Sequence, residues 1–561
     1  MRNIFFLILS CFCLLSVHAQ NETSKDHISL AGIWNFKLDP LNVSIPVKGS
    51  NFVSKFPEEI TLPGSTDQAG KGFKTQDMSS LRLTRMFEYS GAAWYEKENI
   101  FIPESWKDQQ LFLFLERVHW ESQVWINGKF VGKEESLSTP HLYDITSYVK
   151  FGDWNTVRIR VDNGNIHDIA YTHAISAETQ TNWNGIIGRM EIQAVSKVHI
   201  ADVQIYPLQK EKRLKIVAQI VNYSNLPVKG DIRINCHFLN DSQDLHLKEK
   251  NTTFNSSDSL IHLVHYYDLG DKLYTWDEFE PNLYEIDYEI KCCGKSDVRK
   301  IKFGIRDFGT KGTHFTINDI PTFIRGAVNS CEFPITGYPP MGYEEWKKVM
   351  KVYKDYGLNC IRFHSWCPPE SAFQVADELG LYLQVENSDW RFTVGEDEAT
   401  NAFYLDEAQR IFKEYGNHPS FAFFCEGNEL VGKGCVDFLK EMLTEWKKDS
   451  RHLYVAASGY PTVEGSDFFD FYGARPQRWQ EGLKGRFNSQ PLNTRYDYID
   501  YVKKFSIPMV THEIGQWCAY PDFNQISKYI GVLKPYNYEL FREDLRNKKM
   551  LDQAHDCLLY T

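Results

Sequence analysis

Residues 421–429 read FAFFCEGNE, an apolar run that ends abruptly in Asn428 and Glu429. Residues 508–515 read PMVTHEIG, which also runs from apolar residues into a glutamate, Glu513. Short apolar runs bounded by polar residues are typical of strands. Each stretch therefore predicts a strand with a carboxylate at its carboxyl end.

Strands and helices alternate around these two stretches from residue 304 onward. Further strands are predicted at 322–328, 360–365, 382–387, 453–459 and 468–474, with helical patterns at 343–356, 371–379, 401–415 and 436–447. Such alternation builds a parallel sheet, and seven strands point to a (β/α)8 TIM barrel. Only the stretch after residue 515 is left to supply an eighth strand, and it holds 526–533 followed by a charged helical pattern. We expect a barrel domain at 304–561 that is truncated and incomplete.

The chain before residue 304 predicts two β-sandwiches. In 20–200, short alternating strands such as 111–115 and 157–161 are separated by turns, and Asn127-Gly128 is a strong hairpin signal. In 201–303, alternating strands at 214–221, 231–238 and 284–291 fit an immunoglobulin-like sandwich. The predicted fold class is therefore multidomain β and α/β.

Composition restricts the partners of the protein. The 561 residues include 62 Lys and Arg against 74 Asp and Glu, which gives a net charge of −12. A nucleic-acid partner calls for a basic surface, so none is predicted. No run beyond the first twenty residues reaches the roughly 20 apolar residues of a membrane span. The sequence does not indicate an oligomeric state.

Residues 1–19 predict an export signal. Arg2 is the only charged residue before Glu22, residues 4–17 are mostly apolar, and Val-His-Ala places small residues ahead of a cleavage point after Ala19. A lipid-attachment site at Cys11 is the alternative. Either interpretation implies an exported protein, in the periplasm or outside the cell.

The cysteines predict neither a disulfide framework nor a metal site. Ten remain once the predicted signal is removed, and none has C-x-x-C spacing. Most lie in apolar segments and are expected to be small core residues. Cys292 and Cys293 are adjacent, and an isolated disulfide elsewhere stays open. No cofactor is predicted.

The two carboxylates fit the cleavage of a glycosidic bond. One carboxylic acid protonates the leaving oxygen, while a second carboxylate attacks the anomeric carbon. A single glutamate at a strand end is more often a rim residue or an ion-pair partner, so the pair carries the argument. Two other possibilities stay open. One is an inverting hydrolase, whose carboxylates lie roughly 6.5–9.5 Å apart rather than about 5–5.5 Å. The other is a non-catalytic carbohydrate-binding remnant.

Four short motifs resemble glycoside hydrolase family 2, the β-galactosidase, β-glucuronidase and β-mannosidase group. They are AGIW at 31–34, VWING at 124–128, WNGI at 183–186 and FGIR at 303–306. The resemblance covers essentially everything after the signal. It implies a jelly-roll sugar-binding domain at 20–200, an immunoglobulin-like domain and a catalytic barrel.

The resemblance also implies roles for the carboxylates and their neighbours. Glu429 matches the acid/base, which must hold a proton, and Glu513 matches the nucleophile, which must not. A retaining mechanism follows. Asn428 resembles the residue that binds the sugar 2-hydroxyl, and Tyr472 resembles the tyrosine that orients the nucleophile.

Further substrate-binding candidates come from the strand ends. Alternation places Arg362 and His364 on one face. The family often separates this arginine and histidine by three residues, whereas here the gap is two, so His364 either contacts the sugar or supports the acid/base. Glu386 is another carboxylate at the pocket. Trp366 and Trp517 are either an aromatic wall for the sugar or core residues.

Two other activities or groups are not expected. The stretch after Glu386 lacks the Glu-x-His ligands of some β-galactosidases, so no metal is predicted. His512 beside Glu513 suggests a serine hydrolase, but no G-x-S-x-G motif is present. The expected activity is an exported retaining exo-β-glycosidase acting on a carbohydrate. The sequence does not fix the sugar.

Overall fold

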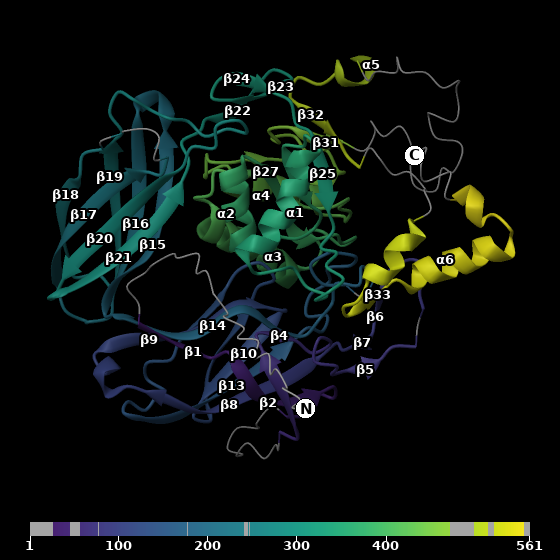
Figure 1. Cartoon of the computed structure of the whole chain (residues 1–561). Helices are drawn as coiled ribbons and strands as arrows, with labels where there is room; N and C mark the ends of the chain where they lie inside the picture. The colour runs from purple at the N-terminus through teal and green to yellow at the C-terminus, as the bar shows by residue number, and fades with distance from the viewer. Residues whose placement is uncertain are drawn as a thin grey trace, which may run out of the picture.

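The computed structural model describes residues 26–44, 56–76, 78–176, 178–240, 245, 247–471, 499–513 and 521–554. Figure 1 shows two groups of β-strands and a third region of mixed strands and helices. The expected export signal lies outside the described residues, as do Tyr472 and Trp517. None of the helices in the described ranges is long and apolar enough to cross a membrane.

The first group is a sandwich of two antiparallel sheets. One has the order β1-β14-β9-β12, with β4 on β14, and the other has the order β11-β10-β13-β8-β2-β3. Their facing side chains share one core that includes Trp34, Leu113 and Ile159, all fully buried. The strands are β1 (Asp26–Ser29), β2 (Gly32–Asp39), β3 (Glu58–Leu62), β4 (Gly64–Ser65), β8 (Ala92–Ile102), β9 (Gln109–Val118), β10 (Glu121–Ile126), β11 (Lys129–Glu135), β12 (His141–Asp144), β13 (Asp153–Asp162) and β14 (Gly185–Ser196).

The predicted hairpin joins β10 to β11. Asn127 and Gly128 have φ angles of 51° and 79°, the left-handed conformation that a two-residue hairpin turn requires and that these residues tolerate best. Three short strands pair outside its two sheets: β5 (Phe73–Lys74) with β7 (Phe87–Glu88), and β6 (Thr84–Arg85) with a strand near the end of the chain. The 3-10 helix η1 (Glu104–Trp106) lies between β8 and β9 in the chain.

The second group is a smaller sandwich with sheet orders β15-β16-β19 and β18-β17-β20-β21. Period-two alternation buries one face of β16 and of β17, and Ile216, Ile234 and Tyr288 meet in the core of this sandwich. Its elements are β15 (Val198–Leu208), η2 (Gln209–Glu211), β16 (Arg213–Asn222), β17 (Val228–Phe238), β18 (Lys250–Ser256), β19 (Leu260–Asp268), β20 (Tyr284–Cys292) and β21 (Lys295–Phe303).

The third region contains parallel strands connected by helices. An antiparallel unit comes first, made of β22 (Phe308–Lys311), β23 (His314–Ile317) and β24 (Ile320–Thr322). A parallel sheet follows in chain order, made of β25 (Gly326–Asn329), β26 (Cys360–Phe363), β27 (Tyr382–Asp389), β28 (Phe421–Gly427) and β29 (Leu453–Tyr454). A second parallel sheet holds β30 (Ser458–Gly459), β31 (Phe469–Phe471) and β32 (Met509–Thr511). A parallel bridge between Asn428 and Ser458 connects the two sheets.

The helices of this region match the predicted patterns closely. They are α1 (Tyr343–Asp355), α2 (Glu370–Leu379), α3 (Glu398–Tyr415) and α4 (Cys435–Trp446), followed by the short α5 (Ile499–Val502). Large apolar side chains such as Trp346, Phe412 and Trp446 pack under the sheet in one core. The sequence therefore predicted this alternation well.

The structure departs most from the predicted strands at three places. The strand at 322–328 begins later, at Gly326, because 320–322 belongs to the β24 hairpin. The strand at 453–459 is split into β29 and β30. Residues 526–533 supply no eighth parallel strand: they overlap η5 (Phe523–Lys528), and β33 (Leu533–Lys534) pairs antiparallel with β6 of the first sandwich. Helix α6 (Tyr536–Asn547) lies beside that pair (Figure 1).

Candidate active site

Glu429 and Glu513 lie just beyond the carboxyl ends of β28 and β32. Their φ angles are 46° and 47°, in the left-handed region that side chains other than glycine rarely adopt. Such strained backbone persists only where surrounding structure holds it, and it concentrates at functional sites. The turn also breaks the alternation of the strand, so that consecutive side chains can face the same space.

His512 lies between the two carboxylates. Its Nε2 is 3.2 Å from Glu513 Oε1 and 3.5 Å from Glu429 Oε1. The two carboxylate oxygens are therefore at most about 6.7 Å apart, the sum of those distances. Gly459 leaves space for the side chains of Glu429 and His512, because a Cβ at this position would lie 3.0 Å from both Glu429 Cγ and His512 Nε2.

The other ring nitrogen of His512 faces a second acidic group. Nδ1 is 3.1 Å from Ser458 Oγ and 3.5 Å from Asp470 Oδ1. Burial disfavours the charged ring, but the Asp470 carboxylate and hydrogen bonds to both glutamates outweigh it and raise the pKa of His512 to about 10. Burial likewise opposes the charge of Asp470, yet His512 and Arg362 lower the pKa of Asp470 to about 2. His512 is therefore an imidazolium at neutral pH.

Glu513 is surrounded by donors. His364 Nε2 is 3.1 Å and Arg362 Nη1 is 3.4 Å from its Oε1. Burial would raise the pKa of Glu513, but hydrogen bonds from His364 and His512 and the charge of Arg362 lower it well below the ordinary range. The side chain is 16% exposed, so the ionised oxygens remain in reach of a ligand.

Arg362 links Glu513 to Asn428. Its Nη2 donates to Asn428 Oδ1 at 2.8 Å, and its Nε donates to Glu386 Oε1 at 2.6 Å. Asn428 is fully buried, and its Nδ2 has no hydrogen-bond partner among the described residues. A buried amide donor without a partner is costly, so this group is suited to donate to a ligand hydroxyl.

The first sandwich also contributes to the site. His173, in the segment between β13 and β14, places its Nδ1 3.0 Å from His364 Nδ1. Burial lowers the pKa of both rings, so both are neutral at neutral pH. A proton on His173 Nδ1 makes His364 Nδ1 the acceptor, which leaves the His364 Nε2 proton for Glu513.

The structure shows the surroundings of three further predicted site residues. His364 contacts Glu513, not Glu429. Glu386 is fully buried and accepts from Arg362 and from the Ser365 backbone, so it supports the arginine instead of facing a substrate. Trp366 is 2% exposed, donates to the Asn329 carbonyl and packs in the core, so it forms no wall of the pocket. Tyr472 and Trp517 lie outside the described residues.

Sequence reasoning missed Asp470, Ser458 and His173 and set His512 aside. Ser458 belongs to the short strand β30 and Asp470 to the short strand β31. The rule that ligands bind at the ends of barrel strands could have drawn attention to both residues. No signal in the sequence pointed to His173, because its position depends on how two domains pack against each other. Among the described residues, no cluster of three His, Cys, Asp or Glu side chains is arranged to hold a metal ion.

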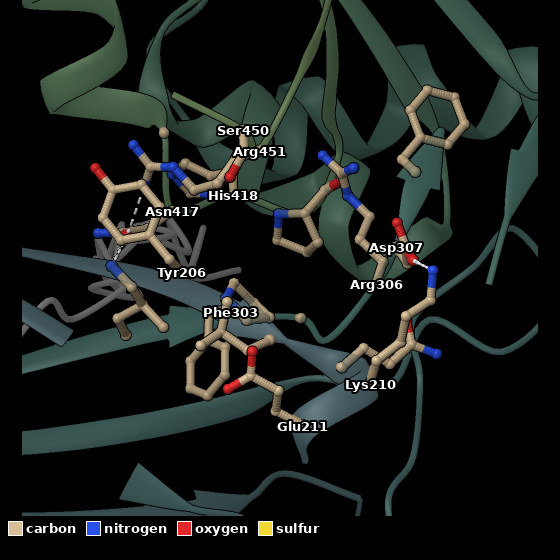
Figure 2. A pocket seen from close by; sticks show the side chains of 18 residues that line it. Tyr206, Lys210, Glu211, Phe303, Arg306, Asp307, Asn417, His418, Ser450 and Arg451 are labelled. Atoms are coloured by element: carbon tan, nitrogen blue, oxygen red, sulfur yellow. Dashed lines mark hydrogen bonds and ion pairs between the residues drawn. The ribbon is translucent and has the colours of Figure 1, made fainter. Parts of the chain in front are cut away.

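A separate cavity of about 320 Å³ lies between the second sandwich and the amino end of β28 (Figure 2). Arg306 lines it and donates to the Pro419 and Phe421 carbonyls, while Lys210 pairs with Asp307 at 3.2 Å. The cavity contains neither Glu429 nor Glu513. The cavity lies at the interface between the second sandwich and the region of parallel strands.

Comparison with known proteins supports the family resemblance. The model "Glycosyl hydrolases family 2, sugar binding domain" matches residues 28–189, and the model "Glycosyl hydrolases family 2" matches 198–306. A beta-galactosidase of Priestia megaterium is 26% identical over 378 residues, which cover 63% of this chain and 35% of that protein. The beta-galactosidase large subunit of Latilactobacillus sakei is 22% identical over 74% of this chain and 70% of its own length.

A solved structure shares the fold. The crystal structure of Bacteroides uniformis beta-glucuronidase superposes with a TM-score of 0.64 at 17% identity, covering 77% of this chain and 52% of the other. The chain thus spans about a third of the Priestia relative and about half of this structure. Two consecutive family models, the matched relatives and the shared fold lead to one assignment. The chain belongs to glycosyl hydrolase family 2.

Proposed function

We propose that the chain is an exported retaining exo-β-glycosidase, which hydrolyses O-glycosidic bonds of oligosaccharides or polysaccharide fragments by double displacement. The convergence of Glu429 and Glu513 on one charged histidine is the observation that carries this proposal. The two carboxylates are close enough together to act on one anomeric carbon from opposite sides. The parallel strands that hold them belong, in this proposal, to a TIM barrel.

In the first step, Glu513 attacks the anomeric carbon and Glu429 gives its proton to the leaving oxygen. The low pKa of Glu513 keeps it ionised for attack. In the second step, Glu429 takes a proton from water, which cleaves the glycosyl–Glu513 ester and restores the original configuration.

Asn428 assists the reaction by binding the sugar, and Arg362 assists it by holding the nucleophile. The free Nδ2 of Asn428 donates to the 2-hydroxyl, a contact that strengthens as the oxocarbenium-like transition state forms. Arg362 fixes the orientation of that amide and holds Glu513 at the same time. We propose Glu429, Glu513, Asn428 and Arg362 as the groups that meet the substrate, with His364 orienting Glu513.

The candidate sugars are inferred from the activities of the relatives. These relatives include a beta-galactosidase and a beta-glucuronidase, so a β-galactoside or a β-glucuronide is the first substrate to try. Export rests on the apolar leader at 4–17, and secreted material should begin at Gln20. N-terminal sequencing that finds Met1 or a lipidated Cys11 contradicts this cleavage.

The activity is tested on a panel of nitrophenyl β-glycosides, with Glu513→Gln as the matched inactive variant. Turnover by the parent chain, loss in the variant and first release of the β-anomer in an NMR time course support the proposal. First release of the α-anomer makes the enzyme inverting. Sugar binding without turnover of any substrate makes the chain a binding remnant.

A further inference from the structure

A row of aromatic rings runs outward from Glu513. His364 contacts the carboxylate, and its ring centroid is 4.9 Å from that of Trp390. Tyr171 is 6.0 Å from Trp390 and 5.7 Å from Phe392, edge-on in both pairs. Trp390 is half-buried, whereas Tyr171 is 44% and Phe392 is 46% exposed. The row therefore starts at the proposed nucleophile and ends in open aromatic faces.

Two distant parts of the chain build this row and fix its position. Tyr171 belongs to the segment between β13 and β14, while Trp390 and Phe392 follow β27. A parallel bridge pairs Ala170 with Trp390, and Thr393 Oγ1 donates to Asp168 Oδ2 at 2.7 Å. The rings are thus held at a junction between the first sandwich and the region of parallel strands.

The row also lies against the chain just after Glu429. Val431 N donates to the Arg391 carbonyl at 3.3 Å, and Val394 N donates to the Val431 carbonyl at 2.9 Å. Residues 390–394 therefore lie beside Val431, which is two residues after the proposed acid, Glu429. That acid protonates the leaving oxygen in the proposed mechanism, so a surface beside the chain that follows it is placed to meet the leaving group.

We propose that Tyr171, Trp390 and Phe392 form a subsite for the sugar on the leaving-group side, so that the preferred substrate has at least two sugar residues. This inference rests on the proposed exo-glycosidase function. Aromatic faces stack on flat apolar surfaces such as the C–H face of a sugar ring. Tyr171 and Phe392 are exposed, so a sugar stacked on their rings keeps its hydroxyl groups in contact with water.

Phe392→Ala and Tyr171→Ala test the subsite with three substrates of the same terminal sugar. For a galactosidase these are lactose, 4-nitrophenyl β-D-galactoside and β-D-galactosyl fluoride, and for a glucuronidase the corresponding glucuronides. Each variant should lower kcat/KM about three- to ten-fold on the disaccharide, the value of one aromatic stack. The fluoride has no sugar in the leaving group, so its kcat/KM should be unchanged.

Trp154→Ala is the matched control, an exposed aromatic residue on β13 that pairs with Phe101 away from the row. It should leave all three substrates unchanged. Equal losses on fluoride and disaccharide overturn the subsite, because the change then acts on the reaction centre. A larger loss on the nitrophenyl substrate than on the disaccharide overturns the sugar as its occupant.

A failure of the glycosidase function is distinguished by calorimetry. If the parent chain cleaves none of these substrates, the activity proposal falls, and binding alone tests the subsite. In the Glu513→Gln variant, lactose should bind more tightly than galactose, and Phe392→Ala should remove the difference. Equal affinities of the two sugars before that substitution refute the subsite.

Discussion

Replacing His512 with glutamine tests whether the positive charge between the carboxylates sets the pH range of the reaction. Glutamine keeps a hydrogen-bond donor of similar reach and removes the charge. In the parent chain the pKa of His512 is raised to about 10, so the ring is charged wherever the enzyme is expected to work. Removing the charge destabilises the ionised form of Glu513 and raises its pKa.

The magnitude follows from the distance. Unit charges 3.2 Å apart interact by about 5 kcal/mol at an effective dielectric constant of about 20. One pKa unit corresponds to about 1.4 kcal/mol. Arg362 stays near Glu513, and water enters part of the space, so we expect a smaller shift of about one to two units. The acid limb of kcat/KM should move upward by that amount.

The basic limb should move in the same direction. His512 Nε2 is 3.5 Å from Glu429, and loss of the positive charge favours the protonated form of this acid. The assay is kcat/KM against pH on one nitrophenyl glycoside, which reports the ionisations of the free enzyme. His364→Gln is the matched control, because it replaces a neutral ring 3.1 Å from Glu513 with another neutral hydrogen-bond donor and removes no charge, so it should move the acid limb less than His512→Gln does.

A profile of His512→Gln that loses height but keeps both limbs in place would refute the electrostatic role. His512 would then serve only to pack the site. A downward movement of the acid limb would contradict the sign of the argument. Either result would also put the ionised state of Glu513 in question.

Four further outcomes are expected. Azide should rescue Glu429→Ala on activated aryl substrates and give a β-glycosyl azide, whereas with Glu513→Ala it should give the inverted product; product NMR reveals any exchange of these roles. Asn428→Ala should cost about 1–3 kcal/mol in transition-state binding, measured as kcat/KM, with 2-hydroxy substrates and almost nothing with 2-deoxy analogues, and equal losses would exclude the 2-hydroxyl contact. Trp276→Ala should reduce the free energy of unfolding by about 3–5 kcal/mol in urea titrations, because this fully buried indole donates to the Asp377 carbonyl at 2.8 Å; a loss below about 1 kcal/mol would contradict its place in the core. The pairing of His512 raises its pKa in the folded state, so its stabilisation should be complete below its ordinary pKa of 6.5 and disappear as the pH rises through about 10; Tm against pH should fall less steeply over that range in His512→Gln.

Local sequence pattern predicted much of the fold. The apolar run at 421–427 became β28, and the amphipathic pattern at 436–447 became α4 one residue away. Asn127-Gly128 formed its hairpin because both residues tolerate positive φ. These features depend on residues adjacent in the chain, so periodicity and turn chemistry are sufficient to find them.

The sequence also placed Glu429 and Glu513 at strand ends, since an apolar run that stops at a carboxylate marks that end. Their roles came from the family resemblance and stay predictions. Pattern did not show that both residues take left-handed backbone, which brings His512 alongside Glu513. Nor did it decide between a wall and a core position for Trp366, because an indole fits either.

Tertiary packing decided the rest. His173 and His364 are 191 residues apart in the chain, and Asp470 reaches His512 from a different strand. Residues 533–534 joined β6 of the first sandwich instead of the parallel sheet, because antiparallel pairing with a distant edge was available to them. Such contacts depend on which surfaces meet after the local elements have formed. The sequence by itself determined the elements and the two carboxylates, and only the folded chain determined the charges and aromatic rings that surround them.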